Sequence, residues 1–492
     1  MTAFYIFSAP RMVVHALANL IHAREDALRL FLCILAGYPL AYIHRTIIVY
    51  KPAHIQHAFF VTVGLVLHIF NSGSDVLHTL LAIVFAYLIT NFMKDRVEKI
   101  VAAHTVFLGY LLVAYWFEES ESYDINWTTP FCVLVLRYIG LVMDVYDGEH
   151  MATLKPDQKK TAIQDVPGLL EIAAFGLFYT GTFAGPQFTL SRFRSVVRGD
   201  WLDEKRQPRA SAQDAALRRF VGGCIYMAIN QFGSAWLPDS YFNSPGFYSQ
   251  SLFWKWTWAV IWFRIVISRY CAIWMIVEGA SILNGLGYNG KDHKGRDRWD
   301  GVRDIHVWKW ELGKDFTDCI QSFNCGTNTW AKNHVLRRLR WLDNKPLAHL
   351  ATLAYLAIWH GYHLGYFLLF GLEFGCVHAQ QQLYKLIDRT PGWAELIAKP
   401  HARPFIQLFG RIVTAYTMGF AFLTMGLVKT RYWIGPVKSM YFLIYILYFA
   451  VWPILHHLLC TILPRKPKGE ETKSNQENTI TEKSTITDKK TS

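Results

Sequence analysis

Long apolar runs recur along the chain, and short polar segments separate them. A helix needs about 20 predominantly apolar residues to cross the hydrocarbon core of a membrane. Runs near this length cover residues 27–50, 57–71, 76–93, 100–117, 129–146, 168–188, 253–279, 347–371, 372–388, 405–428 and 437–463. Because a helix satisfies its own backbone hydrogen bonds in lipid, the pattern predicts an all-α, polytopic membrane protein. The runs at 57–71 and 372–388 are short, so roughly nine to eleven spans are expected, some of them re-entrant.

The two ends of the chain differ from the apolar region between them. Residues 1–26 lack the pattern of a removed signal peptide and are expected to form an amphipathic, interfacial segment. Residues 27–463 are expected to be one multi-pass domain. Residues 464–492 are polar and are expected to be a disordered tail. The tail ends with Lys489 and Lys490 at the fourth and third positions from the carboxylate, which resembles a retrieval signal of endoplasmic-reticulum membrane proteins.

Composition narrows the partners of this membrane protein. The chain is 52% hydrophobic and only 18% charged, which is less charge than soluble proteins normally carry. Its net charge of +13 lies mostly in short loops, which favours anionic lipid head groups over nucleic acid. Residues 191–219 are expected to be such a basic loop on the cytosolic side. The eight cysteines are scattered and include no CxxC pair, so no disulfide framework or metal site is expected.

The stretch 347–370 combines membrane-spanning length with two histidines near its middle, His360 and His363. An ionisable side chain at that depth is costly, so a functional site is expected there. A neutral imidazole can accept the proton of an alcohol near pH 7. His363 follows three residues later on nearly the same helix face, so it is an alternative base or a partner. A structural histidine that is hydrogen-bonded to a neighbouring helix is the other interpretation of His360.

A polar segment at 323–330 lies upstream of this stretch. Its Asn324 and Asn328 side chains are neutral amides, which can polarise a carbonyl or stabilise an oxyanion without bringing charge into the membrane. Alternatively, both amides only complete a turn and a helix cap. For Asn328 these two interpretations are equally favoured.

The same segment predicts a turn followed by a helix. Cys325 and Gly326 are expected to form the turn, and one of residues 327–329 is expected to cap a helix that begins near Trp330. Cys325 is a weaker candidate as a nucleophile, because no base is fixed beside it by the sequence.

The helix expected from Trp330 has a basic side. The basic residues are Lys332, Arg337, Arg338 and Arg340. Such a helix suits a membrane surface, and anchoring there is the simpler interpretation. The alternative is that these cations bind the phosphates of a nucleotide-bearing donor such as coenzyme A.

Several other chemistries lack their motifs. Membrane di-iron enzymes need several clusters of closely spaced histidines, and only three isolated close pairs occur among the 19 histidines. No histidine is followed five residues later by aspartate, as in soluble-type glycerolipid acyltransferases. A GxSxG elbow, a P-loop and a zinc-protease helix are also missing from the sequence.

Five stretches together resemble the lysophospholipid acyltransferase branch of the membrane-bound O-acyltransferase superfamily. They are MDVYDGE at 143–149, TFAGPQF at 182–188, VEGASILNGLGYNG at 277–290, SFNCGTNTWAKNHVLRRLRWL at 322–342 and LAIWHGYHLGY at 356–366. The resemblance runs from about the second span to the last. It implies about eleven helices around a central tunnel, which acyl-CoA enters from the cytosol and the lysophospholipid from the lumenal leaflet or a lateral opening.

The resemblance also implies roles for individual residues. His360 would be the catalytic base and Asn324 its partner. The residues expected to contact substrate are Trp359, Asn328, His363, Trp330, Tyr146 and Gln187. Family members have Asn-x-Asn-Thr-Asn-x-Trp where this chain has Gly326 in place of the middle asparagine, so that asparagine is not essential here.

The expected reaction moves a fatty acyl group, expected to be polyunsaturated, from acyl-CoA to the sn-2 hydroxyl of a lysophospholipid. Lysophosphatidylcholine is the first expectation, followed by the ethanolamine and serine lipids. Acyl-CoA would be a co-substrate, and no cofactor is expected. We also expect an endoplasmic-reticulum membrane, a cytosolic tail that a retrieval coat reads at Lys489 and Lys490, and a homodimer. The alternatives are acylation of a sterol, a diacylglycerol or a protein, and, outside enzymes, a lipid transporter or scramblase.

Overall fold

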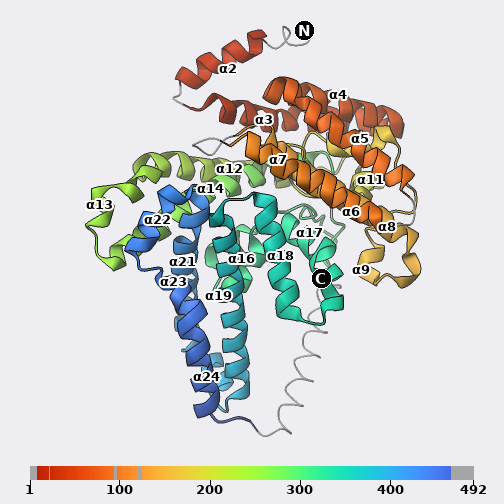
Figure 1. The fold of residues 1–492 in the computed structure, drawn as a ribbon. Coiled ribbons are helices and arrows are strands. Elements are labelled where there is room, and N and C mark those ends of the chain that lie inside the picture. Colours follow the sequence, from red (N-terminus) through yellow and green to blue (C-terminus); the bar gives the residue numbers. More distant parts are fainter. Residues whose placement is uncertain (1–7, 21–22, 94–96, 120–124, 467–492) are drawn as a thin grey trace.

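The computed structural model describes residues 8–20, 23–93, 97–119 and 125–466, and its regular structure is helical (Figure 1). In these ranges β-structure is limited to isolated bridges. The helices up to the middle of the chain are α2 Ser8–Leu20, α3 Glu25–Thr46, α4 Ala53–Ser72, α5 Val76–Phe92, α6 Glu98–Ala103, α7 Gly109–Phe117, α8 Thr128–Glu149, α9 Pro156–Lys159, α10 Leu169–Gly176, α11 Leu190–Arg198, α12 Ser211–Trp236, α13 Pro245–Tyr248 and α14 Leu252–Leu283. The later helices are α15 Val307–Leu312, α16 Phe316–Ser322, α17 Cys325–His334, α18 Lys345–His360, α19 Leu364–Arg389, α20 Trp393–Ala398, α21 Arg403–Gly426, α22 Thr430–Ser439, α23 Leu443–Ile446 and α24 Trp452–Ile462. Lys489 and Lys490 lie outside the described residues.

Seven segments within the described ranges are long and apolar enough to cross a membrane. They are Glu25–Tyr50, Ala53–Phe92, Glu98–Phe117, Thr128–Glu149, Leu252–Leu283, Arg403–Gly426 and Leu443–Ile462. The prediction of an all-α, multi-pass membrane protein is therefore confirmed.

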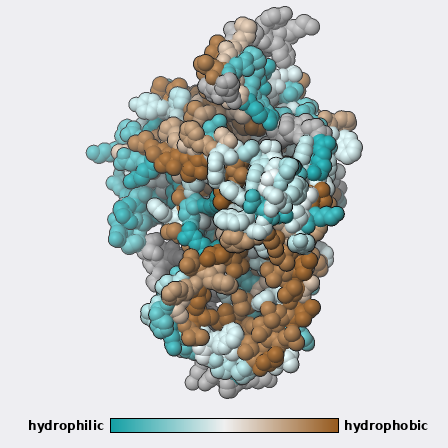
Figure 2. All heavy atoms as spheres, turned by 90° about the vertical axis from the view of Figure 1, so that its left-hand side faces the viewer, coloured by the Kyte–Doolittle hydropathy of each residue, from teal (hydrophilic) through white to brown (hydrophobic). Residues whose placement is uncertain are grey.

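The lower part of the molecule presents a large apolar surface (Figure 2). Helix α24 lies in this lower part in Figure 1. Both α24 and α21 expose large apolar side chains. The exposed residues include Phe405, Phe409, Ile412, Ile454, Leu458 and Ile462. An apolar surface of this extent is typical of a face that contacts membrane lipid.

Helix α14 organises the packing around the site. It packs against α12, α21 and α3, and its inward side chains are buried from Ala259 to Ile282. One apolar core joins α14 to α21, and a second joins α4, α5, α8 and α10. The cavity described below takes lining residues from both cores.

The apolar run at 168–188 is not one membrane-spanning helix, so that part of the prediction is wrong. Helix α10 ends at Gly176, and the chain then continues through turns to α11. The buried Arg137 guanidinium on α8 donates to the carbonyl oxygens of Gly181, at 2.5 Å, and Pro186, at 3.1 Å. These bonds replace the helical bonds that this buried backbone lacks.

The segment 191–219 is also more ordered than the predicted basic loop. It contains α11 and the beginning of α12, a 26-residue helix. Apolar side chains exposed at helical spacing on α12 are Leu217, Val221, Ile225, Ile229, Phe232 and Trp236. Gly, Asn and Gln residues on the same helix interrupt the apolar run, so the hydropathy pattern missed it.

Candidate active site

The apolar stretch at 347–370 is divided into two helices between His360 and His363. Helix α18 ends at His360, and α19 begins at Leu364. Gly361 adopts a φ of +125°, a backbone conformation that side-chain-bearing residues rarely adopt. The prediction of one helix over 347–371 is therefore wrong. Non-helical backbone at this depth is tolerated where it is buried in protein or lines a cavity, and both ends of this break line one.

The His360 imidazole lies among aromatic rings. Its ring centroid is 4.6 Å from that of Trp359, 5.6 Å from Tyr366 and 5.4 Å from Phe370. Among the described residues, no group hydrogen-bonds to this imidazole, and the side chain is only partly buried because it faces the cavity. The interpretation of His360 as a histidine hydrogen-bonded to a neighbouring helix therefore finds no partner in the described part of the chain.

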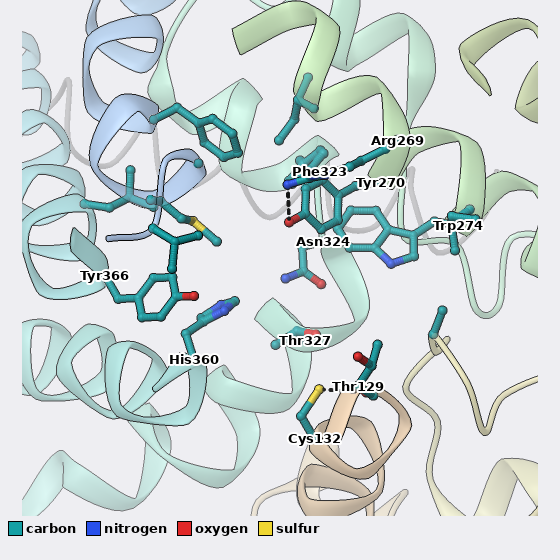
Figure 3. Close-up of a pocket in the computed structure, with 18 of the residues that line it drawn as sticks. Thr129, Cys132, Arg269, Tyr270, Trp274, Phe323, Asn324, Thr327, His360 and Tyr366 are labelled. Carbon is teal, nitrogen blue, oxygen red and sulfur yellow. Dashed lines mark hydrogen bonds between the residues drawn. The ribbon is translucent and has the colours of Figure 1, made fainter. Parts of the chain in front are cut away.

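Asn324 precedes α17 in a left-handed conformation, with a φ of +51° and a ψ of +42°. Asparagine tolerates this region better than most residues. Its side chain does not cap the helix, and within the described ranges its amide makes no hydrogen bond. Figure 3 shows the Asn324 amide and the His360 imidazole directed into the same space.

A neighbouring loop holds this turn in place. The Gly326 N–H donates to Asp304 Oδ1 at 2.7 Å, and the Cys325 N–H donates to the Asp304 carbonyl oxygen at 3.2 Å. An isolated antiparallel bridge joins Ile305 to Phe323. Asp304 therefore satisfies the N–H groups at the start of α17, which leaves the Asn324 amide available to the cavity.

The Asp304 carboxyl should make stability depend on pH. Burial raises its pKa from 3.8 to about 7, and the negative charge of Glu278 adds to this, whereas the Gly326 N–H and Arg219 oppose it. The folded chain thus holds this proton at a higher pH than the unfolded chain does. The free energy of unfolding should therefore fall as the pH rises from 3.8 to about 7.

Asp304→Asn keeps an oxygen acceptor for the Gly326 N–H but cannot ionise. We compare the thermal unfolding midpoint of this variant with that of the unsubstituted protein at pH 5 and at pH 8. The midpoint of the variant minus that of the unsubstituted protein should be larger at pH 8. Size-exclusion profiles after heating measure the midpoint. Asp388→Asn, at an exposed position, is the control. Its unfolding midpoint should change between pH 5 and pH 8 by the same amount as that of the unsubstituted protein. A parallel pH response in the unsubstituted protein and Asp304→Asn would contradict this prediction.

The predicted turn and cap are displaced by several residues. Helix α17 begins at Cys325, so Cys325 and Gly326 form its first turn and none of residues 327–329 caps it. A Cβ atom on Gly326 would lie 2.6 Å from Asp304 Oδ1, which explains why this position holds glycine. The Asn328 amide donates to the carbonyl oxygens of Ile320 and Phe323, at 3.1 and 3.0 Å. Asn328 therefore lines the cavity with its amide held by turn-completing contacts, whereas the Asn324 amide has no such contacts among the described residues.

Cys325 does not have the surroundings of a nucleophile. Its thiol donates to the Gln321 carbonyl oxygen at 3.3 Å, and burial raises its pKa to about 12. A reactive cysteine needs its thiolate form near neutral pH.

His360 and Asn324 line one cavity of about 850 Å³. Residues from α3, α8, α12, α14, α16, α17, α18, α19 and α21 form its wall. Most of these side chains are apolar or aromatic, and a few polar groups project from them (Figure 3). This combination is typical of a site that binds a largely apolar ligand and orients it by a few polar contacts.

His363 belongs to a different part of the cavity wall. Its Nε2 lies 3.8 Å from Glu119 Oε1, and Glu119 also accepts hydrogen bonds from Lys429 and from the Tyr362 hydroxyl. The expectation that both histidines share one helix face is wrong, because the chain leaves the helix between them. His360 faces the Asn324 amide, whereas His363 faces a charged cluster.

The other expected substrate contacts divide into two groups. Trp359 and Gln187 line the cavity, where Trp359 donates to the Cys132 carbonyl oxygen at 3.0 Å and Gln187 donates to that of Val133 at 2.7 Å. Both side chains thereby anchor to α8.

Tyr146 and Trp330 are not among the residues that line this cavity. Tyr146 packs on His150, with ring centroids 4.3 Å apart, and Trp330 stacks on Tyr355 at 5.9 Å. The structure does not bring either residue to His360, and their contacts are those of packing residues.

The basic residues expected to bind phosphate also lie outside the cavity wall. Helix α17 ends at His334, and a 3-10 segment, Leu336–Leu342, replaces the rest of the expected surface helix. Arg338 forms a bidentate ion pair with Asp147, in which Nη2 lies 2.5 Å from Oδ2 and Nη1 lies 2.7 Å from Oδ1. Lys332 and Arg340 are exposed. Their contact with coenzyme A stays a prediction, as does that of Arg337.

The charged residues of the cavity wall that sequence reasoning missed include Arg269 on α14 and Glu373 on α19. Both interrupt apolar runs that were themselves predicted to cross the membrane. The rule that singled out His360, that an ionisable residue within a membrane helix is functional by default, applies equally to them. Among the described residues, no group of three or more His, Cys, Asp or Glu side chains is placed to hold a metal ion.

Comparison with known proteins identifies the family. Residues 112–419, which include Asn324 and His360, match the membrane-bound O-acyltransferase family. The protein named lysophospholipid acyltransferase 5 from Caenorhabditis elegans is 62% identical over 460 residues, which cover 93% of this chain and 97% of that protein. The human protein of the same name is 34% identical over 456 residues, covering 92% and 93%. A Schizosaccharomyces pombe protein named lysophospholipid acyltransferase is 26% identical over 455 residues, covering 87% and 86%.

The family match spans more than half of the chain, and the nematode and human relatives align over nearly their whole length. The chain therefore belongs to the membrane-bound O-acyltransferase family, in the branch of proteins named lysophospholipid acyltransferase 5.

Proposed function

We propose that this protein transfers a fatty acyl group from acyl-CoA to the free sn-2 hydroxyl of a lysophospholipid. One observation carries the proposal. An imidazole and an amide, neither hydrogen-bonded to another described residue, are directed into the same space of a largely apolar cavity. The names of the relatives add the acceptor class.

The reaction is a single transfer with one base. His360 accepts the hydroxyl proton while the hydroxyl oxygen attacks the carbonyl carbon of the thioester. The Asn324 amide donates to the carbonyl oxygen as negative charge develops on it. The carbon–sulfur bond then breaks, and the imidazolium of His360 returns the proton to the sulfur, so that coenzyme A leaves as the thiol. All bonds and protons of this acyl transfer are accounted for without a cofactor or a metal, and acyl-CoA is consumed as a co-substrate.

The surroundings of the pair support amphiphilic substrates. Apolar side chains around His360 and along α19 suit acyl chains, which gain free energy when they leave water. Arg269 brings positive charge to the same wall, and its guanidinium lies 3.4 Å from the Tyr270 hydroxyl. That charge suits the phosphate of a phospholipid better than an uncharged sterol or diacylglycerol.

The finer features are part of the same proposal. We propose lysophosphatidylcholine as the main acceptor, with the ethanolamine and serine lipids as further acceptors and polyunsaturated acyl-CoA as donor. An endoplasmic-reticulum location, a cytosolic tail read by a retrieval coat, and a homodimer are proposed with it.

Product analysis tests the function. Purified protein in lipid nanodiscs receives lysophosphatidylcholine and an isotopically labelled acyl-CoA. We expect thiol release, followed with a thiol-reactive dye, to require the acceptor, and we expect mass spectrometry to find the label at sn-2 of phosphatidylcholine. Label in sterol ester, triacylglycerol or protein would contradict the proposal. Lipid movement across the bilayer without thiol release would instead indicate a transporter or scramblase.

A further inference from the structure

One carboxylate in the cavity wall has no role in the acyl transfer described above. Glu373 lies on α19, and the side of this helix that lines the cavity carries Tyr366, Leu369, Phe370, Glu373 and Cys376. These positions recur every three or four residues, so they form one stripe along the helix. The stripe begins beside the reacting centre, because Tyr366 and Phe370 both contact the His360 ring.

The Glu373 carboxylate has no partner within the described part of the chain. Among the described residues, no hydrogen bond or ion pair reaches its carboxylate. Several other inward carboxylates of the described residues have cationic partners. Glu278 on α14, for example, accepts hydrogen bonds from Arg219 at 2.5 Å and from Arg303 at 2.9 Å. Glu373 differs from Glu278 in that no cation of the described residues pairs with it, and it faces the cavity.

The surroundings of Glu373 are apolar. Helix α16 packs against α19, and its Phe316 forms an apolar cluster with Cys376 and Val377, about one turn beyond Glu373. An ionised carboxylate in such a place is costly unless a cation is bound beside it. An organic ammonium with apolar substituents fits these surroundings better than a hydrated metal ion does, because carbon groups can contact the apolar walls while the carboxylate balances the charge.

Of the two proposed substrates, only the acceptor brings such a cation. Coenzyme A is anionic through its phosphates, so a carboxylate repels it. Lysophosphatidylcholine and lysophosphatidylethanolamine both end in a positively charged nitrogen. Glu373 is therefore matched to the acceptor rather than to the donor.

The order of residues along α19 agrees with this assignment. Phe370 contacts the His360 ring, and Glu373 follows three residues later on the same face. A rise of about 1.5 Å per residue places Glu373 roughly one helical turn further along the cavity wall. In a lysophospholipid the head-group nitrogen also lies beyond the sn-2 oxygen, separated from it by two glycerol carbons, a phosphodiester and a two-carbon link.

We propose that the Glu373 carboxylate binds the cationic nitrogen of the acceptor head group and so selects lysophospholipids that carry an ammonium or quaternary ammonium. The inference rests on the proposed function, which supplies the acceptor. Glu373 takes no part in bond making, so it is a specificity residue and not a catalytic one.

The test compares two acceptors with the same acyl chain, lysophosphatidylcholine and lysophosphatidylglycerol, in detergent micelles with one acyl-CoA. The glycerol head group has no cation. Glu373→Gln removes the charge and keeps the shape. We expect kcat/KM for lysophosphatidylcholine to fall by about ten- to a hundredfold, as on loss of a charge-assisted contact, mostly through KM. The value for lysophosphatidylglycerol should stay the same or rise.

Two further variants make the test specific. Glu373→Asp keeps the carboxylate and should retain the preference for choline. Glu395→Gln makes the same chemical change on α20, at an exposed position outside the cavity wall, and should alter neither acceptor. Each variant is compared only after it elutes as a single species.

Two results would overturn the inference. One is an unchanged KM for lysophosphatidylcholine in Glu373→Gln. The other is an equal loss on both acceptors, which would mean that the carboxylate supports the cavity rather than the head group. If the unsubstituted protein acylates neither lipid, the proposed function is wrong, and so is the head-group site that rests on it.

Discussion

Replacement of His360 by alanine is expected to lower the rate of acyl transfer by about 10²–10⁴-fold, the contribution typical of one positioned base. The imidazole ends α18, faces the cavity and has no hydrogen bond to another described residue. Its loss therefore removes the proton acceptor without breaking a polar network, and the fold should persist. Thiol release by the purified, monodisperse variant measures the effect.

Two histidine variants serve as controls for this result. His349 lies on the same helix but outside the cavity wall, and it packs on Phe374 with ring centroids 5.9 Å apart. His349→Ala should keep nearly full turnover. His363→Ala should lose less activity than His360→Ala, because its imidazole lies beside Glu119. Full turnover in His360→Ala, or complete loss of turnover in His363→Ala alone, would show that His360 is not the base.

The second large effect is expected at Asn324. Removal of a single oxyanion donor typically lowers kcat by about 10²–10³-fold. Asn324→Gly is the sharper variant, because glycine keeps the left-handed backbone and removes only the amide. Asn324→Ala should lose as much activity and also melt at a lower temperature, since a left-handed conformation costs alanine about 1–2 kcal/mol. Initial rates at saturating acyl-CoA and a thermal unfolding series separate the two effects.

Asn328→Ala is the matched control for Asn324. Its amide makes two hydrogen bonds to the turn before α17, each worth about 1 kcal/mol. We expect this variant to lose stability, while the protein that remains folded turns over at a rate much closer to normal. Unimpaired turnover in Asn324→Gly would remove the amide from the reaction.

The fold class was predictable from the sequence because lipid allows few kinds of backbone. Apolar runs of membrane-spanning length predicted α8, α14 and α21 well. Hydropathy failed where the environment was protein instead of lipid. It predicted a span at 168–188, where Arg137 of α8 satisfies a non-helical chain, and it missed α12, whose polar residues interrupt an exposed apolar stripe.

The candidate site was predictable in part for a similar reason. A histidine within an apolar run marked His360, and the amides marked the segment at 323–330. Sequence alone could not separate Asn324 from Asn328, because the difference lies in which amide bonds to the turn and which remains unbonded. Nor could it assign Asp304, whose role depends on a long-range contact with Gly326.

The central claim is that the acceptor hydroxyl reacts between the His360 imidazole and the Asn324 amide. The most direct measurement is an electron cryomicroscopy structure of the protein with lysophosphatidylcholine and a thioether analogue of acyl-CoA that cannot transfer its chain. We expect the sn-2 oxygen within hydrogen-bonding distance of His360 and the carbon that replaces the thioester carbonyl beside Asn324. An acceptor hydroxyl outside this cavity, or one held by His363 with His360 unengaged, would contradict the account.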